Sequence, residues 1–123
     1  MIEINPQYEA IFNPKIIDDD CDKIAKAIST VGQQIAEVLK EGMYKQAVTM
    51  YLQLLKSMAN HFVEDEHYCY FDDMYSPEYA LERIYKEVNR YKIDEESQII
   101  LDMGHSEIMD SECYQEYGYP SYL

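Results

Sequence analysis

Apolar residues recur at alternating intervals of four and three along three stretches of the chain, two of them on either side of Gly42 and one after Ser76. This spacing places the apolar side chains on one face of an α-helix. Gly42 provides a residue that can take a left-handed turn, so the first two helices are expected to fold back on each other. The stripes are Ile24, Ile28, Val31, Ile35 and Val38; Tyr44, Val48, Tyr51, Leu55, Met58 and Phe62; and Leu81, Ile84, Val88 and Tyr91.

Capping signals precede two of these helices. The aspartates 18–20 offer caps and a favourable negative charge at the start of the first helix. Ser76, followed by Pro77 and Glu78, combines an N-cap, a first-turn proline and an acid that matches the helix dipole. The third helix is therefore expected to begin at Pro77.

A fourth helix is expected from Asp94 to about Asp110. Gly104 lies in its middle, where glycine costs about 1 kcal/mol relative to alanine. Its apolar residues are spread around the helix and do not form one stripe. They are Ile99, Ile100, Leu101, Met103, Ile108 and Met109.

The two ends of the chain are expected to be irregular. Two Asn-Pro pairs in 1–17 bias the residues before proline toward extended or turn geometry. In 111–123, four tyrosines accompany Gly118 and Pro120, which excludes an ordinary helix throughout, and such tyrosines usually pack against their own domain or a partner. The sequence thus predicts one all-α domain over 1–123, with four to five helices in antiparallel hairpins and a helical core at 18–110.

Charge restricts the choice of partners. Ten Lys and Arg against 24 Asp and Glu give a formal net charge of −14. This field repels phosphate backbones and anionic lipid headgroups and attracts basic proteins. We expect no direct nucleic-acid binding, no membrane association and, if there is a protein partner, a basic one.

The cysteines and the N-terminal sequence indicate a reduced, intracellular protein. Cys21, Cys69 and Cys113 are odd in number and form no Cys-x-x-Cys pair, so neither a disulfide framework nor a cysteine-rich zinc finger is indicated. The first residues lack a basic start and an apolar run of signal-peptide length. A cytoplasmic location is expected.

The stretch HFVEDEHYCYFDDMY, residues 61–75, is the most unusual part of the sequence. Its aromatic side chains lie among carboxylates, an arrangement in which the rings would form an interface core and the acids would steer a basic partner. Closing one end of the helical domain is an equally good role for these rings. The predicted binding surface comprises Tyr68, Tyr70, Phe71, Asp72, Asp73 and Tyr75.

A metal site is the alternative. Glu64-x-x-His67 and Asp102-x-x-His105 have the spacing by which helices of di-iron and di-manganese bundles offer two ligands each. The helical wheel argues against it, because Glu64 continues the polar face of its helix, which runs through Gln53, Lys56, Ser57 and Asn60. His105, one turn from Leu101 and Ile108, is more typical of a hydrogen-bonded core histidine than of a ligand.

Enzyme motifs are missing from the sequence. It contains no GxSxG elbow, no glycine-rich phosphate loop, no HExxH zinc motif and no calcium loop. Cys69 with His67 or His61 as base is disfavoured as a nucleophile, because flanking carboxylates raise the pKa of a thiol. An enzyme is the minority hypothesis.

The segment EGMYKQAVTMYLQLL resembles the turn and second helix of a tetratricopeptide (TPR) repeat. Gly42 and Tyr44 stand at the turn positions of the family, Ala47 at its small packing position and Tyr51 at its aromatic position, in a partial match over 28–61. The resemblance implies stacked antiparallel helical hairpins used for protein recognition, with no cofactor and no chemistry.

Two fainter resemblances point the same way. Ala80, Ile84 and Val88 follow Ala47, Tyr51 and Leu55 at an interval of 33 residues, close to the TPR period of about 34, which suggests a second copy. YCYFDDMYSP and ECYQEYGYPS are similar to segments that accompany SWIM-type zinc fingers in bacterial proteins, although the ligand pairs of the finger are absent. That similarity implies an accessory or interaction role.

The sequence therefore predicts a non-catalytic protein-interaction or accessory module that uses an acidic, aromatic helical surface and needs no cofactor. The rival is a helical metalloprotein with a divalent metal in a carboxylate and histidine site. A polyanion mimic and a homodimerisation domain also stay open.

Overall fold

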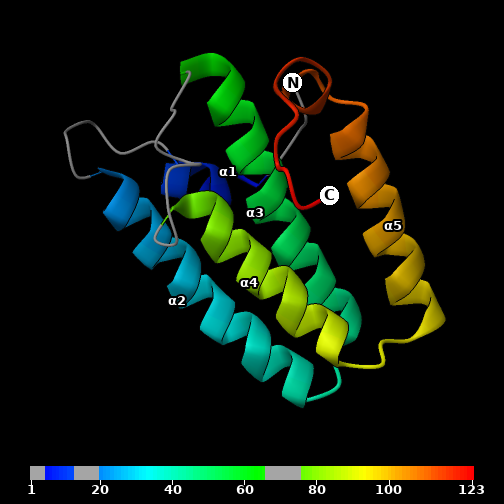
Figure 1. Cartoon of the computed structure of the whole chain (residues 1–123). Coiled ribbons are helices and arrows are strands. Elements are labelled where there is room, and N and C mark those ends of the chain that lie inside the picture. The colour runs from blue at the N-terminus through cyan, green and yellow to red at the C-terminus, as the bar shows by residue number, and fades with distance from the viewer. Residues whose placement is uncertain (1–4, 13–19, 66–75) are drawn as a thin grey trace.

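The computed structural model describes residues 5–12, 20–65 and 76–123 (Figure 1). These residues form helices and no strand, so the expected all-α class is confirmed. Two elements are single turns, η1 of 3₁₀ type and η3 of π type. In chain order the elements are α1 (Pro6–Glu9), η1 (Ala10–Phe12), α2 (Asp20–Lys40), α3 (Tyr44–Asp65), α4 (Pro77–Arg90), α5 (Glu95–Met109) and η3 (Cys113–Tyr117).

Helix α3 is the centre of the fold. α2, α4 and α5 all pack against it, α2 also packs against α4, and α4 and α5 lie on different parts of its surface (Figure 1). The predicted stripes of the first three helices supply much of the core. The largest fully buried side chains are Tyr51, Phe12, Ile24, Ile28, Ile35, Leu39, Leu54, Leu55, Met58, Leu81 and Leu101.

The predicted polar face of α3 is wrong in part. Ser57 is fully buried and Asn60 is 9% exposed, because neighbours cover α3 on several sides, with α1, η1 and η3 adding to the longer helices. The Ser57 hydroxyl donates to the carbonyl of Gln53 within its own helix at 2.8 Å, which satisfies the buried polar group. A central helix can thus bury small polar side chains that a helical wheel predicts to be exposed to solvent.

The turn between α2 and α3 has the geometry that its glycine predicts. Gly42 has a φ of 78°, a left-handed conformation that favours glycine. The N–H of Gly42 donates to the carbonyl of Leu39 at 3.0 Å, and the N–H of Met43 donates to that of Val38 at 3.1 Å. These two bonds form a Schellman motif, which ends α2 and reverses the chain.

The expected helix starts are found at α4 and α5. The Ser76 hydroxyl accepts a hydrogen bond from the N–H of Tyr79 at 3.1 Å, and Pro77 is the first residue of α4. The Asp94 carboxylate caps α5 by accepting from the N–H of Ser97 at 3.3 Å. The predicted boundaries of the fourth helix, Asp94 and Asp110, are its two caps.

The irregular arm predicted for 1–17 contains helical turns in its described part. Asn5 is extended, as a residue before proline should be, yet its side chain accepts from the N–H of Gln7 at 3.1 Å and caps α1. Pro6 is then the first residue of α1. Buried Tyr8 and Phe12 fasten these turns to the core.

The tyrosine-rich tail packs against its own domain. It begins with the π-helical turn η3, which ends at Gly118 with a φ of 73° and is followed by a cis Tyr119–Pro120 peptide bond. Tyr119 and Tyr122 then lie against the core.

No helix within the described residues is both long enough and apolar enough to cross a membrane.

Candidate interaction site

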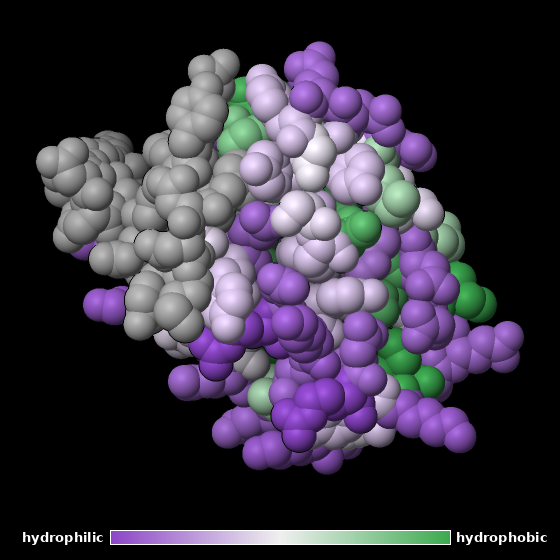
Figure 2. Space-filling model, viewed as in Figure 1, coloured by the Kyte–Doolittle hydropathy of each residue, from purple (hydrophilic) through white to green (hydrophobic). Residues whose placement is uncertain are grey.

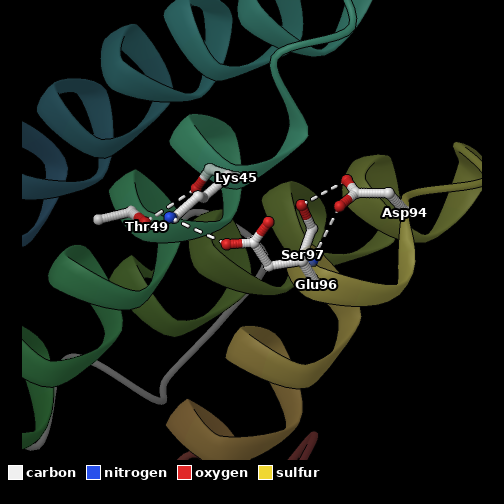
Figure 3. A network of polar contacts seen from close by, with 5 residues as sticks. All are labelled: Lys45, Thr49, Asp94, Glu96 and Ser97. Atoms are coloured by element: carbon white, nitrogen blue, oxygen red, sulfur yellow. Dashed lines mark hydrogen bonds and ion pairs between the residues drawn. The ribbon is translucent and has the colours of Figure 1, made fainter.

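The N-terminal end of α5 contacts α3 through polar side chains (Figure 3). Asp94 accepts hydrogen bonds from the N–H and hydroxyl of Ser97, the latter at 2.6 Å, and the Ser97 hydroxyl bond holds the pKa of Asp94 below its ordinary value. In the same turn, Glu96 Oε1 lies 3.0 Å from Nζ of Lys45 on α3, and the Thr49 hydroxyl donates to the Lys45 carbonyl at 2.8 Å. Both side chains of the ion pair are exposed, so it adds little to stability.

Further along, the two helices approach closely at Gly104. A Cβ atom on this residue would lie 2.5 Å from both methyl carbons of Leu52 on α3, well inside van der Waals contact. Nearby, Lys56 Nζ is 2.8 Å from Glu107 Oε2, and the lysine side chain is only 15% exposed. Gly104 therefore sets how near α5 lies to α3, and Lys56 and Glu107 tie the two helices beside it.

Beside this contact, part of the surface of α5 is apolar and exposed. Three large hydrophobic side chains of this one helix are exposed: Met103 by 67%, Ile99 by 51% and Met109 by 40%. Figure 2 shows hydrophobic colour along the side of the molecule where α5 lies. We call Ile99, Ile100 and Met103, which lie within about one helical turn of each other, the α5 face.

A shallow hollow continues the α5 face toward α3. Leu52, which is only 5% exposed, and Gly104 lie at its floor, where the two helices cross. Its lining combines apolar and acidic side chains with one lysine. The lining residues are Leu52, Lys56, Ile100, Asp102, Met103, Gly104, Ser106, Glu107 and Asp110.

The charge around the α5 face is mainly negative. α5 contains Glu95, Glu96, Asp102 and Glu107 and has no lysine or arginine. Asp110 adds a further carboxylate at the hollow, and Lys56 is engaged by Glu107. An apolar patch inside an acidic rim is thus the main chemical character of this surface.

The inner face of α5 carries a hydrogen-bonded aromatic cluster. Tyr51 Oη lies 3.0 Å from Nε2 of His105 and 2.9 Å from Oη of Tyr122. The Tyr85 ring stacks on Tyr51 with centroids 5.8 Å apart and meets the His105 ring edge-on at 4.9 Å. α3, α4, α5 and the tail therefore meet at one polar point within the core.

Burial shifts the titration of this cluster. It raises the pKa of Tyr51 and Tyr122, and the nearby Tyr51, Glu78 and Glu82 add to the rise at Tyr122. It lowers the pKa of His105, an effect that the Asp102 carboxylate opposes. In the His105 tautomer that leaves Nε2 unprotonated, this nitrogen accepts a hydrogen bond from the Tyr51 hydroxyl, and the Tyr122 hydroxyl then donates to Tyr51. These groups are held neutral, which suits packing better than acid–base chemistry near pH 7.

The two predicted metal-ligand pairs can be followed only in part. Asp102 is exposed and accepts a hydrogen bond from Gln98 Nε2 at 2.9 Å, whereas His105 turns inward to Tyr51. Glu64 belongs to the last turn of α3, and its side chain, like His67, lies outside the described residues. Among the side chains that are described, no three His, Cys, Asp or Glu residues are grouped so as to hold a metal ion.

The predicted aromatic binding surface lies outside the described residues. This applies to Tyr68, Tyr70, Phe71, Asp72, Asp73 and Tyr75, so their role stays a prediction. The α5 face, by contrast, was not among the predicted sites. Its signal was present as the spread of apolar residues around the fourth helix, which is typical of a helix with a second apolar face.

Comparison with protein-family models, with curated proteins and with solved structures found no match to this chain, so the structure and the sequence alone support its function.

Proposed function

We propose that this protein is a non-catalytic interaction module and that the α5 face binds a basic, amphipathic segment of another protein. The observation that carries the proposal is the exposure of Ile99 and Met103 on one helix that also carries four carboxylates. Isolated exposed apolar residues are common, but a group of them on one acidic helix is typical of an interaction site.

The chemistry of the face suits a helical partner with lysine or arginine beside its apolar residues. Methionine is flexible and polarizable, so Met103 can adapt to different apolar side chains that enter the hollow over Gly104. The carboxylates of Asp102 and Asp110 would pair with basic residues at the edge of that contact. A second copy of this chain fits less well, because two molecules of net charge −14 repel each other.

The resemblance to TPR hairpins supports the same class of function, since it implies protein recognition without chemistry. The predicted aromatic surface at 68–75 belongs to the proposal as a second contact region. Its basic partner would be attracted by the same overall charge.

The proposal is tested with a designed probe, a fluorescent amphipathic helix with leucines on one face and lysines on the other. Fluorescence anisotropy measures its affinity for the intact protein and for the Ile99→Gln/Met103→Gln variant. We expect the variant to bind about tenfold or more weakly, because it removes the apolar centre of the contact. Affinity should also fall between about 50 and 500 mM salt, as acidic steering is screened.

Met43→Gln is the matched control, because Met43 is 43% exposed and lies outside α5. It should leave binding unchanged. Equal affinity of the probe for wild type and for the α5 variant, with both proteins folded by circular dichroism, would show that the α5 face is not the site.

A further inference from the structure

Residues 119–123 occupy a surface built by α3 and α4, on a different side of α5 from its exposed face. Tyr51 and Phe62 of α3 and Glu78 and Tyr85 of α4 provide its contacts, and we call these four residues the segment-binding surface. In Figure 1 the red end of the chain runs beside α3. Contacts of this kind resemble those of a bound peptide more than those of a helix in a bundle.

The first group of contacts is made by a carboxylate. Glu78 is 8% exposed, and its Oε1 accepts hydrogen bonds from the backbone N–H of Ser121 at 2.6 Å and from the Ser121 hydroxyl at 2.7 Å. A nearly buried carboxylate is costly unless hydrogen bonds satisfy it. Glu78 therefore recognises both the backbone and the hydroxyl of the residue it holds.

The second group of contacts recognises a phenol. The hydroxyl of Tyr122 bonds to Tyr51, and its ring lies 5.7 Å from that of Tyr85. The preceding aromatic, Tyr119, meets Phe62 edge-on at a centroid distance of 5.8 Å. The surface thus offers separate places for an aromatic residue, a hydroxyl residue and a tyrosine.

The backbone geometry allows the segment to leave without unfolding a helix. The N–H of Gly118 donates to the Tyr114 carbonyl at 2.9 Å, and this bond completes η3. After Gly118, the hydrogen bonds described here between the segment and the rest of the protein are made by the side chains of Glu78, Tyr51 and Cys113. The Cys113 thiol donates to the Tyr119 carbonyl at 3.1 Å. Gly118, in a left-handed conformation, lies where the segment departs.

We propose that the segment-binding surface is a peptide site, that it accepts an uncharged segment of another protein with a Ser-Tyr or Thr-Tyr pair, and that residues 119–123 are its internal competitor. The chemistry follows from the occupant in place, since Glu78 selects the hydroxyl residue and Tyr51 selects the phenol. An acidic or phosphorylated segment would be repelled by Glu78. The internal copy lowers the apparent affinity for an external one, because the free surface is only fractionally populated.

Native-state hydrogen exchange tests whether the segment opens on its own. The Ser121 amide reports directly on the bond to Glu78, so we expect it to exchange much faster than the core amides of α3, through a local opening. Exchange of Ser121 only by global unfolding would show that the segment is an integral part of the core, and this would overturn the proposal.

Peptide binding is the second test. The probe is a fluorescein-labelled peptide, Tyr-Pro-Ser-Tyr-Leu, blocked at both ends and added to the full chain or to the Ser121→Ala/Tyr122→Ala variant. We expect saturable binding that is about tenfold tighter to the variant, whose internal competitor has lost its hydroxyl contacts. The control peptide, Tyr-Pro-Ala-Phe-Leu, should bind about tenfold more weakly than the first.

Three other outcomes would contradict the proposal. A folded variant that binds neither peptide, or binds both equally, would show no recognition of the Ser-Tyr pair. If the wild type instead forms dimers in sedimentation at high concentration and the variant does not, a second copy is the occupant. A variant that fails to fold would identify the segment as core, in agreement with slow exchange at Ser121.

Discussion

At the residue scale, Gly104 shows how one position serves two purposes. As a mid-helix glycine it weakens α5, and this is the only property that the sequence conveys. In the structure its missing side chain lets α5 approach Leu52, and the residue lines the hollow beside Met103. The long-range neighbour cannot be predicted from the sequence, because helix propensity contains no information on which helix lies opposite.

Gly104→Ala should destabilise the protein even though alanine favours a helix. The added Cβ meets Leu52 at 2.5 Å, and relieving that overlap in a packed interface typically costs about 1–3 kcal/mol, against a gain of about 1 kcal/mol in helix propensity. Thermal denaturation of the single variants and of Gly104→Ala/Leu52→Ala measures the coupling. The double variant should lose less than the sum of the singles, and simple additivity would contradict the predicted overlap.

His105 should make stability depend on pH. Its pKa is lower in the folded protein than the value of about 6.5 expected when unfolded, so below that pH the unfolded state binds more protons and stability falls as the pH falls. Tyr51 and Tyr85 contact the His105 ring, and Asp102 is the charge that opposes the shift.

The thermal midpoint measured between about pH 7.5 and 5.5 checks this prediction. His105→Gln keeps an acceptor for Tyr51 but does not titrate, so the midpoint of this variant should decrease less over the same range. Parallel curves for the two proteins would show that other groups cause the pH dependence.

At the element scale, the sequence predicted where the helices lie along the chain better than it predicted which of their faces are buried. The four-three stripes and the caps at Ser76 and Asp94 located α2 to α5, because caps and periodicity are local properties. The central position of α3, and with it the burial of Ser57 and Asn60, depends on packing order and had no local signal. The second apolar face of α5 did have one, in the spread of its hydrophobic residues.

The cap of α4 offers a test at this scale. Ser76→Ala removes the side-chain acceptor for the N–H of Tyr79 and should lower stability by about 1 kcal/mol, since the cap is 5% exposed and water replaces it poorly. Chemical denaturation with urea gives the value. Ser76→Thr retains the hydroxyl and should lose less, whereas equal losses would indicate that packing rather than capping is responsible.

At the scale of the whole molecule, long-range contacts decide what the sequence left open. The sequence predicted that the tail tyrosines pack against their own domain or a partner. The contacts that they make join Tyr122 to Tyr51, 71 positions apart, and Ser121 to Glu78, 43 positions apart. No periodic pattern connects such residues. The net charge, in contrast, was fully determined by composition.

That charge should make the fold more stable at higher salt. A chain of 123 residues with a net charge of −14 repels itself in the compact state, and salt screens this repulsion. The thermal midpoint is expected to rise between about 10 and 300 mM sodium chloride at pH 7. A midpoint that falls over this range would mean that the ion pairs, such as Lys56 with Glu107, outweigh the net repulsion.

The hydrogen-bonded tyrosines also give the protein a built-in optical signal. It has 13 tyrosines and no tryptophan, so the near-ultraviolet absorbance of the phenolate measures tyrosine ionisation without interference from tryptophan. Ordinary tyrosines ionise near pH 10, but burial raises the pKa of Tyr51 and Tyr122, which retain their protons until the fold opens. The unfolded chain releases these protons at a lower pH than the folded chain, so the fold loses stability as the pH rises above about 10. Alkali should therefore unfold the protein, and Tyr51 and Tyr122 should ionise together with the loss of helix.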